Sequence, residues 1–172
     1  EKWGVVVMLL NEFFDYKNKL METLCKNENI VRLVTDSESA PVPNYSLAYT
    51  QLFPFEYIPE TVDDGRIFIC FDVDIAQVYD KTYYEPVLYL WVFAHKSKMR
   101  LSQGGIRTDQ LAVEINKELN GSRYFGLGEL DLYSVGRFSP ISDYQGRVMT
   151  YAAKDFNRLG ISKKPPANPK RP

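Results

Sequence analysis

The sequence predicts an α+β fold, a mainly antiparallel four-stranded sheet with helices packed on one face. Two long β-like runs, residues 66–79 and 86–95, precede a helical run at 105–120, and two more strands flank the turn Asp143-Tyr-Gln-Gly146. Another helical run at residues 9–26 comes first, which gives the order α-β-β-α-β-β. Because this order places helices on one side only, we expect the other sheet face to be free.

Residues 9–26 are predicted to form an amphipathic helix. Asn11 is a candidate N-cap, and Leu20 and Leu24 belong to an apolar stripe at helical spacing. The stripe marks the face that packs on the sheet. A short second helical turn is predicted at residues 30–34.

Residues 1–8 are interpreted as a possible N-terminal extension, because Met8 comes just before the predicted helix. The apolar run at residues 5–10 is too short to span a membrane. It also lacks a small-residue cleavage site, so we expect no signal peptide and no membrane partner.

The connection at residues 35–65 is expected to contain no regular helix or central strand, because its prolines are incompatible with both. It is nonetheless rich in large apolar side chains. Residues 53–59 are predicted to form an extended arm that packs either on its own domain or on a neighbouring subunit. Phe53, Phe55 and Tyr57 are the candidate interface side chains of this arm.

The two long strands differ in their side-chain pattern. The first places Phe71 and Val73 on one face and Asp72 and Asp74 on the other, since successive side chains of a strand alternate. The second, residues 86–95, is apolar on both faces. This pattern predicts a central strand that is covered on both sides.

The second half of the chain completes the predicted sheet. The helical run at 105–120 carries Leu111 on its apolar face, and Glu114 is expected to point away from that face. Strands are predicted at residues 129–138 and 147–156.

A single α+β domain is therefore predicted over residues 9–158, followed by a basic, proline-rich tail at residues 159–172. The tail has few core-forming residues, so we expect an extended or disordered peptide. Lys163, Lys164 and Arg171 are candidate interface residues, because a basic tail can hook onto a neighbouring subunit.

The composition argues against several kinds of chemistry. A formal net charge of −1 gives no global basic field to hold nucleic acid. His95 is the single histidine, so a catalytic triad or a metal site could use only one imidazole. Cys25 and Cys70 have no cysteine or histidine at metal spacing, so we expect buried free thiols in a reducing compartment. With no phosphate-binding loop either, we expect no cofactor and no enzyme.

Two charged groups leave alternatives open. Asp72 and Asp74 either hold a divalent cation with Glu129 or Asp131, or form a solvated or lumen-facing acidic strip. A basic cluster either contacts nucleic acid or an acidic partner, or is a solvated loop. Its members are Lys96, Lys98, Arg100 and Arg107.

The pattern of the chain resembles the tail-terminator and neck proteins of tailed bacteriophages. The order of helix, aromatic proline-rich connection, hairpin, helix and hairpin is similar to theirs over roughly residues 10–157. The segments that carry the resemblance are residues 105–115, 119–123, 125–128, 138–147 and 154–157. The long 35–65 connection and the extended tail depart from the family pattern.

This resemblance implies a structural virion protein of the phage neck. Six copies would assemble in the host cytoplasm into a ring that terminates the tail tube and joins it to the head connector. The implied partners are further copies of the chain, the tail tube protein and the head–tail connector or adaptor proteins, with transient, non-specific passage of DNA. Asp72 and Asp74 would line the lumen, where a mildly acidic wall lets DNA slide.

Other functions stay open beside this one. The chain could be a head-completion protein or another neck adaptor. It could also be a small ligand- or peptide-binding module that uses the open sheet face. A small hydrolase would use Asp72, Asp74 and His95.

Overall fold

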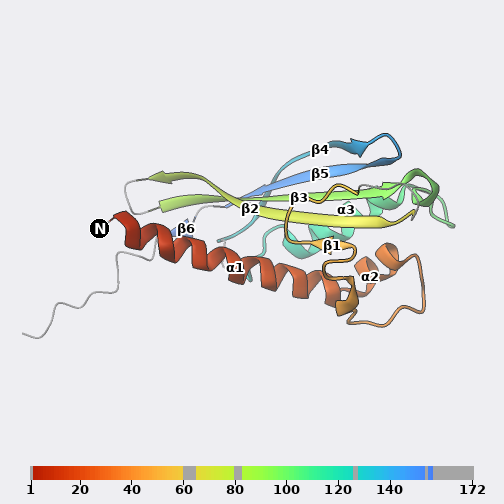
Figure 1. The fold of residues 1–172 in the computed structure, drawn as a ribbon, viewed down its shortest axis with the longest axis horizontal. Helices are drawn as coiled ribbons and strands as arrows, with labels where there is room; N and C mark the ends of the chain where they lie inside the picture. The colour runs from red at the N-terminus through yellow and green to blue at the C-terminus, as the bar shows by residue number, and fades with distance from the viewer. Residues whose placement is uncertain (1, 60–64, 80–82, 126–127, 154, 157–172) are drawn as a thin grey trace, which may run out of the picture.

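The computed structural model describes residues 2–59, 65–79, 83–125, 128–153 and 155–156. Three α-helices pack on one face of an open sheet (Figure 1), which confirms the predicted α+β class. They are α1 (Lys2–Lys26), α2 (Glu28–Thr35) and α3 (Arg107–Leu119). Two 3-10 turns, η1 (Tyr45–Leu47) and η2 (Lys96–Lys98), lie in the connections. No helix among these described residues is long and apolar enough to cross a membrane.

The sheet has more strands than the four predicted. Its strands are β1 (Leu52–Phe53), β2 (Ile67–Tyr79), β3 (Tyr83–His95), β4 (Asp131–Ile141), β5 (Tyr144–Ala152) and β6 (Asp155–Phe156). The main path runs β1-β2-β3-β5-β4, and β6 pairs with β3 beside this path. The β1–β2 pairing is parallel and all the others are antiparallel. The prediction missed β1, because a two-residue strand shows no alternation in the sequence. The strand predicted at 147–156 covers both β5 and β6, which the structure separates.

Several predicted boundaries are wrong. Helix α1 already begins at Lys2, so Asn11 lies inside the helix, and the possible extension is continuous with it. The residues before Asn11 include no proline to stop the helix. Asn27 is a true cap: it precedes α2 and accepts a hydrogen bond from the backbone N–H of Ile30 at 3.0 Å. The turn predicted at residues 143–146 is shorter, because β5 already begins at Tyr144.

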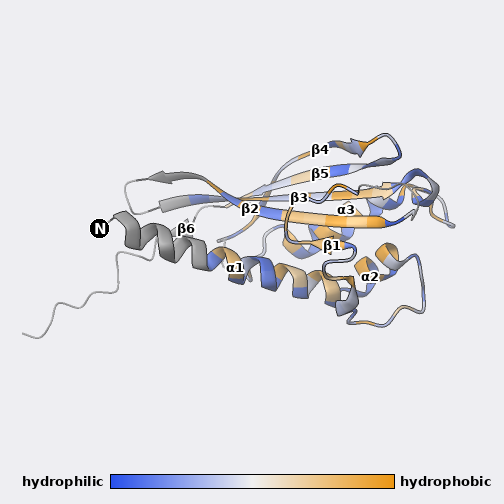
Figure 2. Ribbon diagram, viewed as in Figure 1, coloured by the Kyte–Doolittle hydropathy of each residue, from blue (hydrophilic) through white to orange (hydrophobic). Residues whose placement is uncertain are grey.

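The main core lies between the helices and the sheet. Figure 2 shows hydrophobic residues on the helices and on the part of β2 beside β1. Leu24 of α1, Ile30 of α2 and Leu111 of α3 are fully buried in one cluster with strand residues Phe71 and Leu90. The apolar helical stripes predicted from the sequence therefore form this core.

A second, smaller core covers part of the opposite sheet face. Phe53 of the arm stacks on Tyr57, with ring centroids 4.1 Å apart, and both rings lie against Phe68 of β2. Phe93 of β3 and Tyr144 of β5 complete this aromatic cluster. Phe53 and Tyr57 of the arm thus pack on their own domain, as in the first of the two alternatives. The prediction of a wholly free sheet face is wrong where this aromatic cluster covers the sheet.

Strand β3 occupies the centre of the sheet, between β2 and β5. Leu88, Leu90 and Val92 face the helices, whereas Phe93 belongs to the aromatic cluster on the other side. The prediction of a central strand with cover on both faces is confirmed for this part of β3.

Candidate assembly surface

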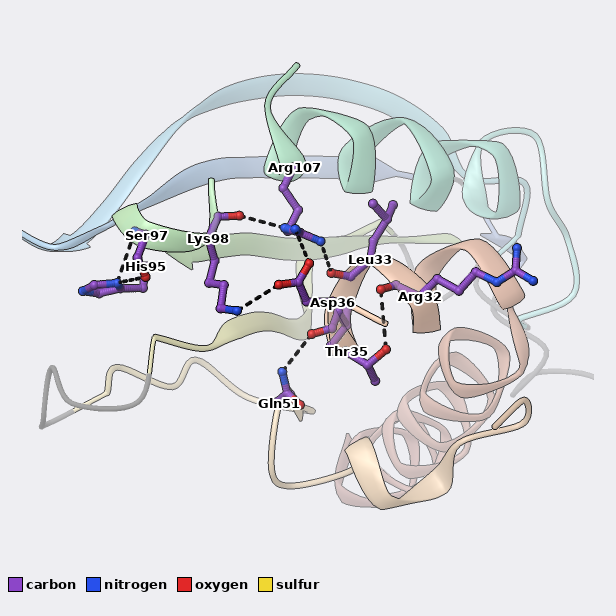
Figure 3. Close-up of polar contacts among 10 residues, drawn as sticks. Arg32, Leu33, Thr35, Asp36, Gln51, His95, Ser97, Lys98 and Arg107 are labelled. Atoms are coloured by element: carbon purple, nitrogen blue, oxygen red, sulfur yellow. Dashed lines mark hydrogen bonds and ion pairs between the residues drawn. The ribbon is translucent and has the colours of Figure 1, made fainter. Parts of the chain in front are cut away.

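A buried arginine joins α2, η2 and α3 (Figure 3). The side chain of Arg107, the first residue of α3, is held by three groups. Its Nε donates to the carbonyl of Lys98 at 2.7 Å, Nη1 to the carbonyl of Leu33 at 3.0 Å, and Nη2 to Asp36 Oδ1 at 2.5 Å. This geometry uses the planar fork of the guanidinium to hold three segments together.

Asp36 is the acidic member of this junction. It is the C-cap of α2 in the left-handed region, at φ 55°, a conformation that aspartate tolerates better than most residues. Lys98 Nζ bonds its other oxygen at 2.8 Å. The hydrogen bond from Lys98, together with the nearby Arg107 charge, lowers the pKa of Asp36 below its ordinary value. The carboxylate is therefore held in its charged form.

The predicted basic cluster is largely neutralised from within the chain. Lys96 pairs with Asp143 at 2.5 Å, and Lys98 and Arg107 both pair with Asp36. Arg100 is exposed and borders an open cleft of about 530 Å³ beside the junction. These ion pairs connect parts of the same chain and leave little net positive charge to bind a nucleic acid backbone.

The acidic residues of β2 do not converge on a metal site. Asp72 pairs with Lys17 of α1 at 2.6 Å, and Asp74 is exposed. The registers place Asp74 and Asp131 three strands apart across the sheet, which is about 14 Å at the usual strand spacing. They are too far apart to share a cation. Among the described residues, no three acidic, histidine or cysteine side chains gather to hold a metal ion.

His95 lies at the other end of the sheet from these carboxylates. Asp74 pairs with Val87 on β3, eight residues before His95, a separation of about 27 Å along the strand. The Nδ1 atom of His95 lies 2.7 Å from Ser97 Oγ, and the imidazole ring packs against Tyr144. The alternative of a hydrolase built from His95, Asp72 and Asp74 is therefore wrong.

An exposed apolar surface lies on β4. Within the described chain this 11-residue strand pairs only with β5, so the hydrogen-bonding groups of its outer edge face no strand. Leu132, Tyr133 and Val135 are 36%, 79% and 52% exposed. A register shift between Leu132 and Ser134 leaves Tyr133 at a bulge. Exposed apolar residues on a long open edge are typical of a strand that meets another chain.

The opposite edge of the sheet is also partly open. The short strand β1 pairs with only Ile69 and Cys70 of β2. The backbone of β2 from Phe71 to Tyr79 thus has no strand beyond it among the described residues. The sheet therefore has two different edges, β4 and the outer part of β2, that no further described strand covers. On the β2 side, Asp72 Oδ1 accepts a hydrogen bond from the backbone N–H of Val73 at 2.8 Å and pairs with Lys17 of α1.

The residues predicted as an interface are divided by the structure. Phe53 and Tyr57 pack within the domain, whereas Phe55 is 43% exposed. Lys163, Lys164 and Arg171 lie outside the described residues.

Sequence reasoning missed two features of this surface. Glu114 was expected to point away from the apolar face of its helix, but it is only 6% exposed. It accepts hydrogen bonds from Asn29, Gln110 and Lys117 at 3.1, 2.9 and 2.8 Å. Tyr133 was also missed, because alternation alone does not tell an edge strand from a central one. No signal within its own strand could have shown this exposure.

Comparison with protein families places the chain in a known family. The chain belongs to the YomW family, which it matches over residues 27–153. The matched region runs from the cap of α2 to the end of β5, and so contains both open edges and the Arg107 junction. The family name is phage-derived, of the SPbeta type, and associates the chain with phages. No curated protein matches the chain.

Proposed function

Starting from this phage association, we propose that the protein is a structural component of the phage neck and not an enzyme. In this proposal six copies form a ring that terminates the tail tube and docks it to the head connector, and DNA passes through the lumen. The observation that carries the proposal is the pair of free sheet edges, β4 on one side and the outer part of β2 on the other.

Two unlike edges suit a closed ring. If the β4 edge of one copy meets the β2 edge of the next, each copy uses two different surfaces, and such head-to-tail contacts close into a ring when the rotation allows it. Pairing would satisfy the open backbone groups of both strands and bury Val135 and its apolar neighbours. An isolated monomer would leave this surface exposed to water.

The charges fit a conduit that does not grip DNA. The net charge is −1, and ion pairs within the chain neutralise most of the predicted basic cluster. In the proposed ring Asp74 is the main acidic residue of the lumen, because Lys17 already neutralises Asp72. Repulsion between Asp74 and the phosphates keeps DNA free to slide. A head-completion protein or another neck adaptor would use the same kind of ring.

The proposal is tested by the mass of the full-length protein in solution. Light scattering over a range of concentrations, with and without purified tail tubes, should give a hexamer or a ring that forms on the tubes. Val135→Lys should weaken the ring, because a charge at an edge strand opposes pairing. Tyr45→Lys is the control, since Tyr45 is 53% exposed in η1, outside both edge strands. A strict monomer that ignores tail tubes would overturn the proposal.

A second candidate is a peptide-binding module. An open apolar groove of about 360 Å³ lies between α3 and β4, with Val113, Leu132, Val135 and Met149 among its lining residues. An extended peptide could pair with the β4 edge and place side chains in this groove. This candidate would be favoured if the protein is a monomer that binds peptides and the Val135→Lys variant does not bind them.

A further inference from the structure

A groove with an acidic rim lies at the start of β4. It has a volume of about 760 Å³ and is formed where β4 begins and β5 ends beside β3. We name it the β4 groove, and its lining residues are Glu85, Val87, Glu129, Asp131, Leu132, Tyr133, Ala152 and Ala153. Among the residues that the structure describes, no lysine or arginine lines it.

The rim carries more negative charge than the described chain neutralises. Glu129 pairs with Arg123, whose side chain is 78% exposed. Glu85 and Asp131 have no ion pair within the described part of the chain. The groove therefore suits a cationic ligand that brings more than one positive charge.

The floor and wall of the groove suit a proline-rich ligand. Val87 and Ala152 provide apolar surface, and Tyr133 stands at the bulge of β4 with 79% of its surface exposed. Exposed aromatic rings beside an apolar groove are the surface that extended proline-rich segments recognise, because proline rings pack flat against them.

The chain itself contains such a ligand. Residues 160–172 include four basic residues, four prolines and no acidic residue. The basic residues are Lys163, Lys164, Lys170 and Arg171, and the prolines are Pro165, Pro166, Pro169 and Pro172. In charge and composition this segment is the complement of the β4 groove.

The direction of the chain favours a groove on another copy. Strand β5 ends at Ala152 opposite Val87, and β6 continues along β3 to Phe156, opposite Tyr83. The chain has thus passed its own groove and runs away from it. The residues after Phe156 span up to about 50 Å when extended at about 3.1 Å per residue, which is ample to reach a neighbour.

We propose that the β4 groove binds the basic, proline-rich segment 160–172 of a second copy of this chain. The inference rests on the ring proposed above and adds the contact that would link one subunit to the next. Ion pairs from Lys163 and Lys164 to the acidic rim, and proline packing on Tyr133, hold the segment.

Charge reversal in the full-length protein tests this contact. One variant reverses the groove (Glu129→Lys with Asp131→Lys), and the other reverses the segment (Lys163→Glu with Lys164→Glu). Each should weaken self-association about tenfold by light scattering, since two exposed ion pairs become repulsive. Glu38→Lys, at an exposed carboxylate outside the groove, is the control and should associate like the wild type. Circular dichroism should show unchanged folding in all variants.

Mixing the two reversed variants separates contact between copies from contact within one chain. If the segment reaches a second copy, the reversed groove of one variant binds the reversed segment of the other, and mixing restores association. If the segment folds back on its own groove, mixing restores nothing and the inference is overturned.

A labelled peptide of residues 160–172 distinguishes this inference from the ring itself. If the peptide binds the full-length wild-type protein but not the groove variant, the inference is supported even if no ring forms. A ring that persists unchanged in both charge-reversed variants, with no peptide binding, overturns the inference and leaves the ring standing.

Discussion

Arg107 and Asp36 join the start of α3 to the end of α2 through a hydrogen bond of 2.5 Å. Arg107 is only 6% exposed, whereas Asp36 is partly open to water and shared with Lys98. The buried partner is therefore the one that the fold depends on, because its remaining bonds go to the backbone carbonyls of Leu33 in α2 and Lys98 in η2.

Arg107→Ala should lower the free energy of unfolding by about 2–4 kcal/mol, because it leaves two backbone carbonyls and a carboxylate without their donor. Arg107→Lys should recover only part of this loss, since a lysine cannot bond three groups in a planar fork. Urea unfolding measures both. Arg100→Ala, at an exposed arginine of the same cluster, is the control, and an equal loss there would contradict the special role of Arg107.

Local periodicity predicted the elements but not their long-range contacts. The stripe with Leu20 and Leu24 and the alternation around Phe71 are properties of neighbouring residues, and both lie in the core. Arg107 and Glu114 are different, because each also bonds groups in or beside α2, some 70 to 85 positions earlier in the chain. No local pattern could indicate those partners.

The candidate surface shows the same limit. Asp72 and Asp74 do share the strand face that the alternation predicts, but Lys17 pairs with only one of them. Which strand lies at the sheet edge follows from the β3–β5 pairing, which connects segments far apart in the chain. The exposure of Tyr133 could therefore not be predicted from its own strand.

The fold should lose stability in acid through Glu114. Hydrogen bonds to Glu114, first of all from Lys117, lower its pKa below the ordinary value of 4.5. A carboxylate with a lower pKa in the folded state stabilises the fold fully above the unfolded-state pKa. This contribution disappears as the pH falls from about 4.5 through the folded-state pKa. Urea unfolding as a function of pH should show the loss.

The matched variant is Glu114→Gln, which keeps the shape of the side chain and cannot ionise. It should be less stable than the wild type at neutral pH and should flatten the dependence below about pH 4.5. Glu118→Gln removes one negative charge from the same helix and is the control for net charge. A wild-type slope in Glu114→Gln would show that other carboxylates cause the acid loss.

Phe93 and Trp91, two aromatic residues of β3, should differ in their effect on stability. Phe93 is fully buried between Phe138 and Tyr144, so Phe93→Ala should cost about 3–5 kcal/mol. Trp91 is only partly buried, and Trp91→Ala should cost less than Phe93→Ala. Thermal melting of both variants checks the order. Equal losses would mean that Trp91 is covered in solution, for example by another subunit.

Gly146 should be required for the pairing of β3 with β5. A Cβ built on Gly146 would lie 1.8 Å from the carbonyl oxygen of Val92 and 2.7 Å from Phe93 Cα, and neither backbone atom can move without separating the strands. Gly146→Ala should therefore destabilise the fold by about 3 kcal/mol or more. Gly136→Ala is the control, because its new Cβ would meet only a side-chain methyl of Val148 at 3.3 Å, which can shift. Urea unfolding should separate the two variants clearly, and similar stabilities would mean that β3 and β5 are not held at the register Phe93–Gly146.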